Sequence, residues 1–340
     1  MEQPWIHKKS TDGLFILAPS FIVVAIVFIF QDAIQAIERY YSFYTWLFLI
    51  VFIDVAHVYA TLFKTYFVPS AFKKRKALLI TLPIICFGIG MVLFAFGSAV
   101  FWSVLAYVAV FHFIRQQYGI MRLYSRNEGK TAWTSGFDNL VIYTATGYPM
   151  LYWFLSSPRE FNWFTEFDFF KFESILLLEV LRWCYAFVVV IYLFRTVFMA
   201  VKTQYFNIPK HAIIIGTFLS WYVGIVYFNN DLVFTLLNVV SHGIPYMALI
   251  YLNEIEKKSA TDLGVLNYVK GLKGVLLFLL FLFAVAFFEE YVWEVAVWNE
   301  KFTTPYFAVS NWQFIVVPLL TVPQLTHYFL DGFIWRSKAA

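Results

Sequence analysis

The chain has 340 residues, of which 61% are hydrophobic and only 14% are charged, and its formal net charge is +4. Soluble domains carry about 25% charged residues, so this composition, with a mean hydropathy of +0.70, excludes a soluble globular protein. It predicts an all-α, polytopic integral membrane protein. Both cysteines fall inside apolar segments, which argues against a disulfide framework and against a thiolate metal site.

Apolar segments long enough to cross a bilayer recur along the whole chain. A spanning helix needs about 20 mainly apolar residues, and we count ten candidates with no soluble domain or internal repeat between them. We therefore expect a single transmembrane domain over residues 1–340. The ten segments are 14–30, 45–67, 77–97, 99–124, 137–155, 175–201, 211–228, 232–252, 272–290 and 312–334.

Basic residues alternate with the expected spans. With ten spans, one side of the membrane receives Lys8, Lys9, Lys73, Lys74, Arg75, Lys76, Arg122, Arg126, Lys130, Lys202, Lys210, Lys257, Lys258, Lys270, Arg336 and Lys338. The opposite side receives the acidic loops. Because cytoplasmic loops are enriched in Lys and Arg, we expect the protein in a bacterial inner membrane with both termini on the cytoplasmic side. The run at 73–76 is expected to contact anionic membrane lipids rather than nucleic acid.

Four histidines lie within apolar segments, at positions His57, His112, His242 and His327. In the ten-span topology their helices all run in the same direction, and the histidines lie about 12, 13, 10 and 15 residues into them. At a rise of about 1.5 Å per residue, these depths agree within roughly 8 Å. Ionisable residues inside a membrane are costly and usually mark function, so we expect the four to form one buried site.

On the second and tenth spans, each histidine shares a helix face with a carboxylate. Asp54 and His57 are three residues apart, with Thr61 and Lys64 further along the same stripe, and His327 and Asp331 are four residues apart. A metal-bound imidazole needs a hydrogen-bond acceptor that fixes its tautomer. Asp54 and Asp331 are therefore candidate metal ligands or candidate acceptors.

The fourth and eighth spans carry uncharged partners. Gln116 follows His112 by four residues, with Arg115 on the same face, and Tyr246 follows His242 by four residues. Gln116 and Tyr246 are candidates for orienting the imidazoles. Arg115 either forms an ion pair with one of the carboxylates or binds an acidic headgroup of a substrate.

Imidazoles and carboxylates together suit Fe(II), Zn or Cu. Several histidines and a carboxylate reached from lipid are typical of non-haem iron that activates oxygen on a lipophilic or amphipathic small molecule. Zinc-dependent hydrolysis, with Asp54 or Asp331 as the base, is an alternative. Three further interpretations remain open: b-type haem with axial histidines, a His/Asp proton relay in a transporter, and hydrogen bonding between helices.

Three strings of the chain resemble signatures of a family of bacterial polytopic membrane proteins: Asp54-Val-Ala-His57, His112-Phe-Ile-Arg115-Gln116 and His327-Tyr-Phe-Leu-Asp331. In organisation, the four histidine segments are also similar to the Brp/Blh-type β-carotene dioxygenases. Those are all-helical membrane enzymes in which four histidines from different helices hold one iron. The resemblance implies an iron centre and an oxidative reaction on a lipophilic substrate.

Overall fold

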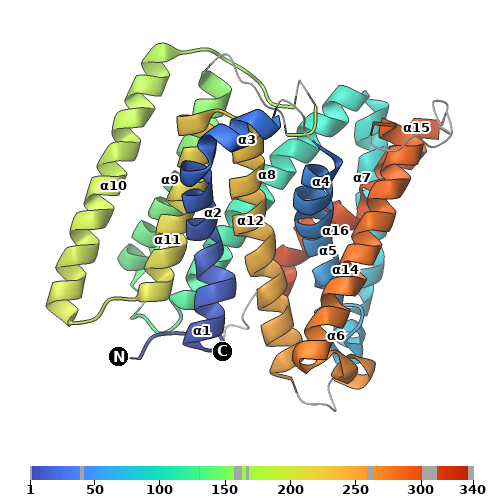
Figure 1. The fold of residues 1–340 in the computed structure, drawn as a ribbon, viewed down its shortest axis with the longest axis horizontal. Helices are drawn as coiled ribbons and strands as arrows, with labels where there is room; N and C mark the ends of the chain where they lie inside the picture. The colour runs from blue at the N-terminus through green and yellow to red at the C-terminus, as the bar shows by residue number, and fades with distance from the viewer. Residues whose placement is uncertain are drawn as a thin grey trace. The chain divides into compact units, whose positions relative to one another are not determined.

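The structure is a computed structural model that describes residues 2–38, 42–129, 131–156, 163–165, 168–258, 263–300 and 312–335. These residues form helices joined by loops, and no strand occurs among them (Figure 1). The predicted all-α class is therefore confirmed. The chain divides into two compact units: unit 1 is Met1–Tyr40 with Val110–His242, and unit 2 is Tyr41–Ala109 with Gly243–Ala340. A single domain over residues 1–340 stays a prediction.

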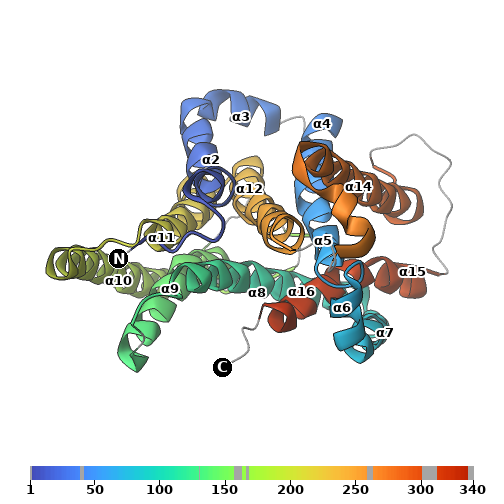
Figure 2. The ribbon, with the colours of Figure 1, turned by 90° about the horizontal axis from the view of Figure 1, so that it is seen from below.

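Unit 1 is a group of helices around α9 and α11. Figure 2 shows α9, α10 and α11 side by side, and α11 also packs on α2. Trp153 of α9 and Trp221 of α11 are among the largest fully buried side chains. The helices are α1 (Lys9–Asp12), α2 (Ala18–Ile29), α3 (Gln31–Glu38), the later part of α8 (Ser98–Tyr124), α9 (Ala132–Leu155), α10 (Ile175–Thr203), α11 (Ile208–Trp221) and the first part of α12 (Asp231–Ile250).

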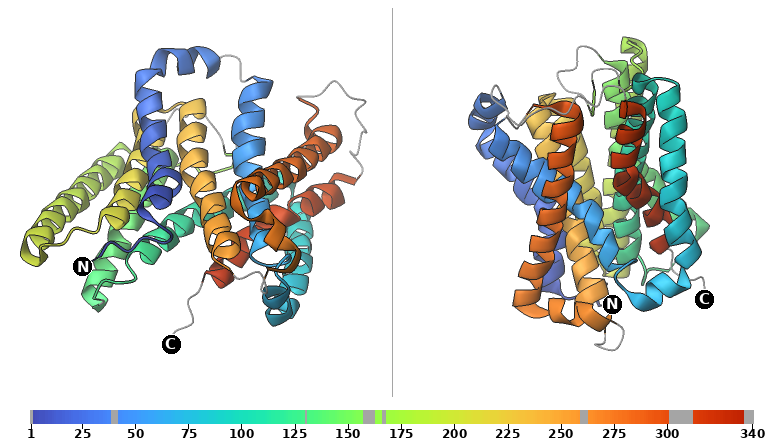
Figure 3. Two further views of the ribbon diagram at one scale, coloured as in Figure 1. Left: turned by 60° about the horizontal axis from the view of Figure 1, so that its bottom comes forward. Right: turned by 90° about the vertical axis from the view of Figure 1, so that its right-hand side faces the viewer.

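Unit 2 contains the remaining helices. α14 lies beside α5, and α15 and α16 lie along α7 (Figure 3). The segment Phe43–Phe63 is one continuous helix. A π-helical stretch over Leu47–Val55 joins α4 to α5, and a 3₁₀ turn over Thr61–Phe63 follows. The helices are α4 (Phe43–Trp46), α5 (Ala56–Ala60), α6 (Pro69–Lys74), α7 (Lys76–Ala95), the start of α8, the end of α12, α14 (Gly271–Trp293), α15 (Gln313–Leu320) and α16 (Val322–Ile334).

Eight helices within the described ranges are long and apolar enough to cross a membrane, and a bent pair makes a possible ninth. The chain therefore has the architecture of a multi-pass membrane protein. The expected count of ten is not reached, because α9, which contains the expected span 137–155, falls short of the required apolarity. Asp138 and Asn139 lie near its start. The eight are Lys9–Ile29, Phe43–Phe63, Lys76–Ala95, Ser98–Tyr124, Ile175–Thr203, Ile208–Phe228, Asp231–Glu256 and Gly271–Trp298.

Glycine and proline account for two interruptions. Gly97 has a φ of +115°, a left-handed conformation that favours glycine, and it separates α7 from α8 as the sequence predicts. The expected span 312–334 is bent by 40° between α15 and α16. Pro323 has no N–H to donate to the carbonyl of Leu319, so the helical ladder breaks at this point.

Candidate metal centre

All four intramembrane histidines are buried, with exposed fractions of 1% for His57, 3% for His112, 1% for His242 and 2% for His327. They form two pairs. His112 and His242 belong to unit 1, and His57 and His327 belong to unit 2. Each pair brings together two helices that are remote in sequence, so the pairing is a product of tertiary packing.

The unit 2 pair joins α5 to α16. The rings of His57 and His327 lie edge to face, with centroids 5.0 Å apart and planes at 77°. The ring of Tyr246 lies beside both, at 5.8 Å from His57 and 5.1 Å from His327. Three aromatic rings from three helices therefore surround one point in unit 2.

A chain of hydrogen bonds connects His327 to Asp331. The Tyr246 hydroxyl donates to Asp331 Oδ1 at 2.7 Å, and it lies 2.9 Å from Thr61 Oγ1. Thr61 Oγ1 is also 2.7 Å from His327 Nδ1. With Asp331 ionised and accepting the Tyr246 proton, the Thr61 proton points to the Tyr246 oxygen and Thr61 accepts from His327. In that arrangement His327 carries its proton on Nδ1 and keeps a lone pair on Nε2.

Neither carboxylate touches its histidine directly. Asp54 Oδ1 is 3.8 Å from His57 Nδ1, and Asp331 Oδ1 is 4.0 Å from His327 Nδ1, both beyond hydrogen-bond distance. Asp331 acts on His327 through Tyr246 and Thr61, and Trp335 donates a further hydrogen bond to Asp331. Asp331 is therefore connected to His327 through two hydroxyls, whereas Asp54 Oδ1 lies beyond hydrogen-bond distance of His57 Nδ1, and a role of either carboxylate as a metal ligand stays a prediction.

The unit 1 pair joins α8 to α12. The rings of His112 and His242 have centroids 5.1 Å apart and planes at 80°. The ring of Phe113 stacks on His242 with centroids 3.8 Å apart and planes at 10°. This stacking restrains the plane of the His242 imidazole, so an apolar neighbour does the orienting that Tyr246 was expected to do.

Two glutamines of α8 hold the backbone of α12 beside this pair. Pro245 has no N–H, which leaves the carbonyl of Ser241 without its helical donor. Gln117 Nε2 donates to that carbonyl at 3.3 Å, and Gln116 Nε2 donates to the carbonyl of His242 at 2.8 Å. The other amide atom of Gln116, Oε1, is buried without a hydrogen-bond partner. Gln116 therefore positions His242 through its main chain rather than binding the imidazole of His112.

Arg115 lies apart from the buried groups of α8. Its side chain is exposed, its Nη1 donates to the Tyr143 hydroxyl at 2.6 Å, and its guanidinium lies 4.6 Å from the centroid of the Tyr118 ring. An exposed guanidinium over an aromatic ring can still bind an acidic headgroup. The printed contacts of Arg115 are with two tyrosines of unit 1, and its binding of an acidic headgroup stays a prediction.

Sequence reasoning missed two contributors. Thr61 links His327 to Tyr246, although the sequence showed only that it shares a helix stripe with His57. Phe113 stacks on His242, and an aromatic residue in a span gives no signal of such a role. Comparison of the chain with protein-family models, with curated proteins and with solved structures found no match.

Proposed function

We propose that this protein is a membrane-embedded, histidine-ligated metalloenzyme, a non-haem iron oxygenase or oxidase that acts on a lipophilic or amphipathic substrate. The observation that carries the proposal is the chain from Asp331 through Tyr246 and Thr61 to His327. With Asp331 ionised, this chain leaves Nε2 of a buried imidazole unprotonated beside a second imidazole, that of His57. Neutral imidazoles whose other nitrogen is held by a hydrogen bond are the usual form of metal-ligating histidine.

The separation of the rings supports shared coordination within each pair. With a metal–nitrogen bond of about 2.1 Å and a ring centroid about 1.1 Å further on, each centroid lies about 3.2 Å from the ion. Two ligands at an angle of about 90–110° then have centroids about 4.5–5.2 Å apart. The His57–His327 and His112–His242 separations of 5.0 and 5.1 Å fall in this interval.

The same arithmetic disfavours axial haem ligation by either pair. Two axial imidazoles lie on opposite sides of the iron, so their centroids would be about 6.4 Å apart. Both observed separations are shorter than that by more than an ångström. Haem is therefore the weaker alternative for these pairs.

The donor set favours iron over softer metals. It consists of imidazole nitrogens with the carboxylates of Asp54 and Asp331, and Fe(II) or Zn suits such a set. A ferrous ion held by histidines and a carboxylate activates dioxygen. Of this chain's own residues, Tyr246 and Gln116 position imidazoles, and Arg115 offers a charge to an acidic substrate group. That His57, His112, His242 and His327 all bind one ion is a sequence-based prediction that spans both units and stays a prediction.

We also propose a membrane topology of ten spans in a bacterial inner membrane, with both termini on the cytoplasmic side. The two spans beyond the eight would be α9 and the bent pair α15–α16. The alternation of basic and acidic loops supports this count. Cysteine accessibility at each loop, assayed from both sides of inverted vesicles, tests it.

A second function is supported by the same hydrogen-bond chain. Asp331, Tyr246, Thr61 and His327 form an unbroken series of groups that carry exchangeable protons, and His57 and Asp54 lie next to it. A proton-coupled transporter would use such a relay. A relay works without a bound metal, which separates the two functions experimentally.

The deciding experiment is elemental analysis with an absorption spectrum on untagged protein purified in detergent without chelators. We expect about one iron per chain and no Soret band, as for histidine-ligated non-haem iron. The double variants His57→Gln/His327→Gln and His112→Gln/His242→Gln should each lose metal. His211→Gln is the matched control, because this histidine of unit 1 bonds to Tyr192 at 2.7 Å and belongs to neither pair.

The possible outcomes separate the functions. No iron or zinc in the wild-type protein would reject the metalloenzyme and leave the proton relay or plain helix packing. A Soret band lost in either double variant would replace non-haem iron by haem. Loss of metal in both double variants would indicate one ion shared by all four histidines, and partial loss in each would indicate one ion per pair.

A further inference from the structure

The start of the chain forms an ordered, basic surface in unit 1, far along the sequence from all four histidines. Gln3 Nε2 donates to the carbonyl of Phe206 at 2.8 Å, and the amide of Ile208 donates to Gln3 Oε1 at 3.0 Å. Arg126 Nη2 donates to the carbonyl of Trp5 at 2.6 Å. The first residues are thus fastened to loops of unit 1, and the residues that follow are held in a fixed position.

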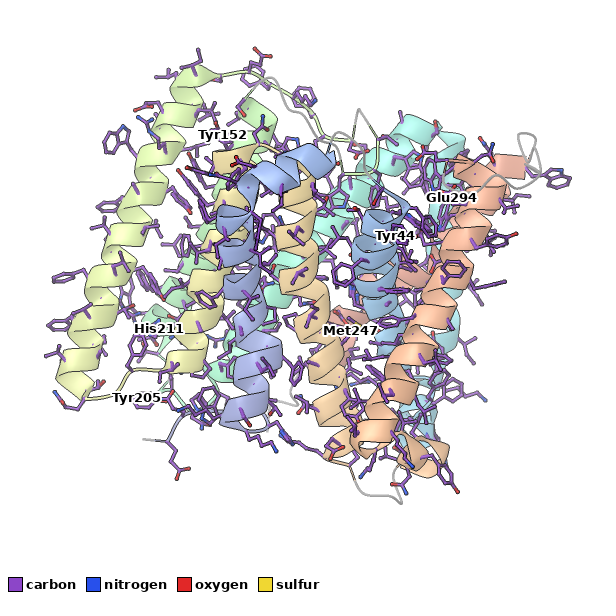
Figure 4. The ribbon with its side chains drawn as sticks, viewed as in Figure 1. Tyr44, Tyr152, Tyr205, His211, Met247 and Glu294 are labelled. Atoms are coloured by element: carbon purple, nitrogen blue, oxygen red, sulfur yellow. The ribbon has the colours of Figure 1, made fainter. Side chains whose placement is uncertain are left out.

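Tyr205 adds a further fastening at this end of unit 1, below His211 in Figure 4. Its hydroxyl donates to the carbonyl of Glu2 at 3.3 Å. Burial, helped by the carboxylate of Glu128, raises the pKa of the Tyr205 phenol, so it stays protonated as a donor at neutral pH. The backbone that leads to Lys8 and Lys9 is therefore preorganised.

The charge of this surface is positive on balance, because Asp12 is turned inward and Glu2 is the one exposed acid of residues 2–18. Asp12 is fully buried, and its oxygens accept hydrogen bonds from the amides of Ile6 and His7 and from the Tyr124 hydroxyl at 3.2 Å. Lys8 and Lys9 are exposed. The two ammonium groups at the surface therefore outnumber Glu2, and the exposed part of this segment keeps a net positive charge.

A shallow groove of about 680 Å³, open along most of its surface, begins at these lysines. Its polar end is lined by Lys8, Lys9 and Ser10, and its apolar end by Gly13, Leu14 and Ala18. A Cβ on Gly13 would meet nothing within 4 Å, so the glycine leaves open space there. Ser10 and Ala18 are about 12 Å apart along the helix axis. The groove thus changes from cationic to apolar over the distance from a phospholipid headgroup to its upper acyl chain.

We propose that this groove binds one anionic phospholipid, with its phosphate between Lys8 and Lys9 and one acyl chain along Gly13, Leu14 and Ala18. Two observations point to a lipid rather than a soluble anion. The groove continues the cationic end onto apolar side chains, and it lies at the start of Lys9–Ile29, a helix apolar enough to cross a membrane. The lysines supply charge recognition, and the space at Gly13 supplies room for the chain.

Native mass spectrometry of the detergent-solubilised protein, titrated with dioleoyl phosphatidylglycerol, tests this proposal. Phosphatidylcholine with the same chains is the zwitterionic comparison. We expect one phosphatidylglycerol bound preferentially per chain, and about tenfold or greater weakening in Lys8→Gln/Lys9→Gln. Gly13→Leu, which keeps both charges but fills the apolar end, should weaken binding as well. Lys171→Gln/Lys202→Gln, with the same loss of charge at exposed lysines of unit 1 outside the groove and outside the run at 73–76, is the matched control and should leave this binding unchanged.

Three results would overturn the proposal. Equal binding of the two lipids by the wild-type protein would show that charge does not select the ligand. Equal weakening by the Lys171/Lys202 control would show a general charge effect rather than a site. Displacement of the lipid by millimolar glycerol phosphate, with no effect of Gly13→Leu, would show a soluble phosphate ester as the ligand. Unchanged elution on size exclusion would establish that each variant is folded.

Discussion

Replacing Thr61 by Val tests whether the hydrogen-bond chain prepares His327 for metal. The two side chains have the same shape and Thr61 is only 3% exposed, so no cavity forms and only the hydroxyl is lost. His327 Nδ1–H loses its acceptor at 2.7 Å, whereas the Tyr246 hydroxyl keeps Asp331. One buried donor left without a partner costs about 1–3 kcal/mol of folding free energy. Loss of the group that orients a ligating histidine lowers metal affinity by about 10–100-fold.

The assay is Fe(II) affinity by competition with a chromophoric chelator, together with thermal unfolding in detergent. Thr61→Ser keeps the hydroxyl and should retain most of the affinity. Thr65→Val is the matched control, because Thr65 is equally buried and its hydroxyl donates only to the carbonyl of Thr61. If Thr61→Val binds iron as tightly as the wild type, the chain does not set the state of His327 and the reasoning is refuted.

Two further predictions concern stability. A Cβ on Gly243 would lie 2.9 Å from the backbone oxygen of Ile53, so Gly243→Ala should destabilise the protein by about 1–3 kcal/mol. Gly119 has open space around it, so Gly119→Ala should leave the stability unchanged or raise it. Thermal unfolding of the two variants shows whether each change lowers or raises the stability. Lys210 lies 2.7 Å from Asp138 and is 5% exposed, so Lys210→Met should cost about 3–5 kcal/mol in denaturant unfolding. A loss of unfolding free energy below about 1 kcal/mol would instead show that Lys210 and Asp138 form a solvated ion pair.

Some of the fold follows from local sequence alone. The length and apolarity of each segment predict helices of membrane-spanning length, because lipid requires backbone groups to bond within their own helix. The break at Gly97 follows from its freedom to adopt positive φ. The span count does not follow so directly, because the polar start of α9 and the bend before Pro323 change what a simple hydropathy count assigns.

Part of the candidate site also follows from the sequence, and part follows only from the tertiary structure. The sequence identified the four histidines and their neighbours on each helix, because helical periodicity fixes which residues share a face. Pro245 has no N–H, so the carbonyl of Ser241 lacks its helical donor. Periodicity does not say which helix lies opposite, so it did not reveal that the Gln117 amide donates to the carbonyl of Ser241.

The identity of the long-range partners was therefore decided by tertiary structure alone. Tyr246 shares a face with His242, yet its hydroxyl bonds to Asp331, and Thr61 bonds to His327 across 266 residues of sequence. Which hydroxyl meets which imidazole depends on the packing of helices from distant parts of the chain. The sequence by itself determined that polar groups must be buried here, and only the packing decided which groups satisfy one another, because a hydrogen bond depends on ångström distances that no local pattern sets.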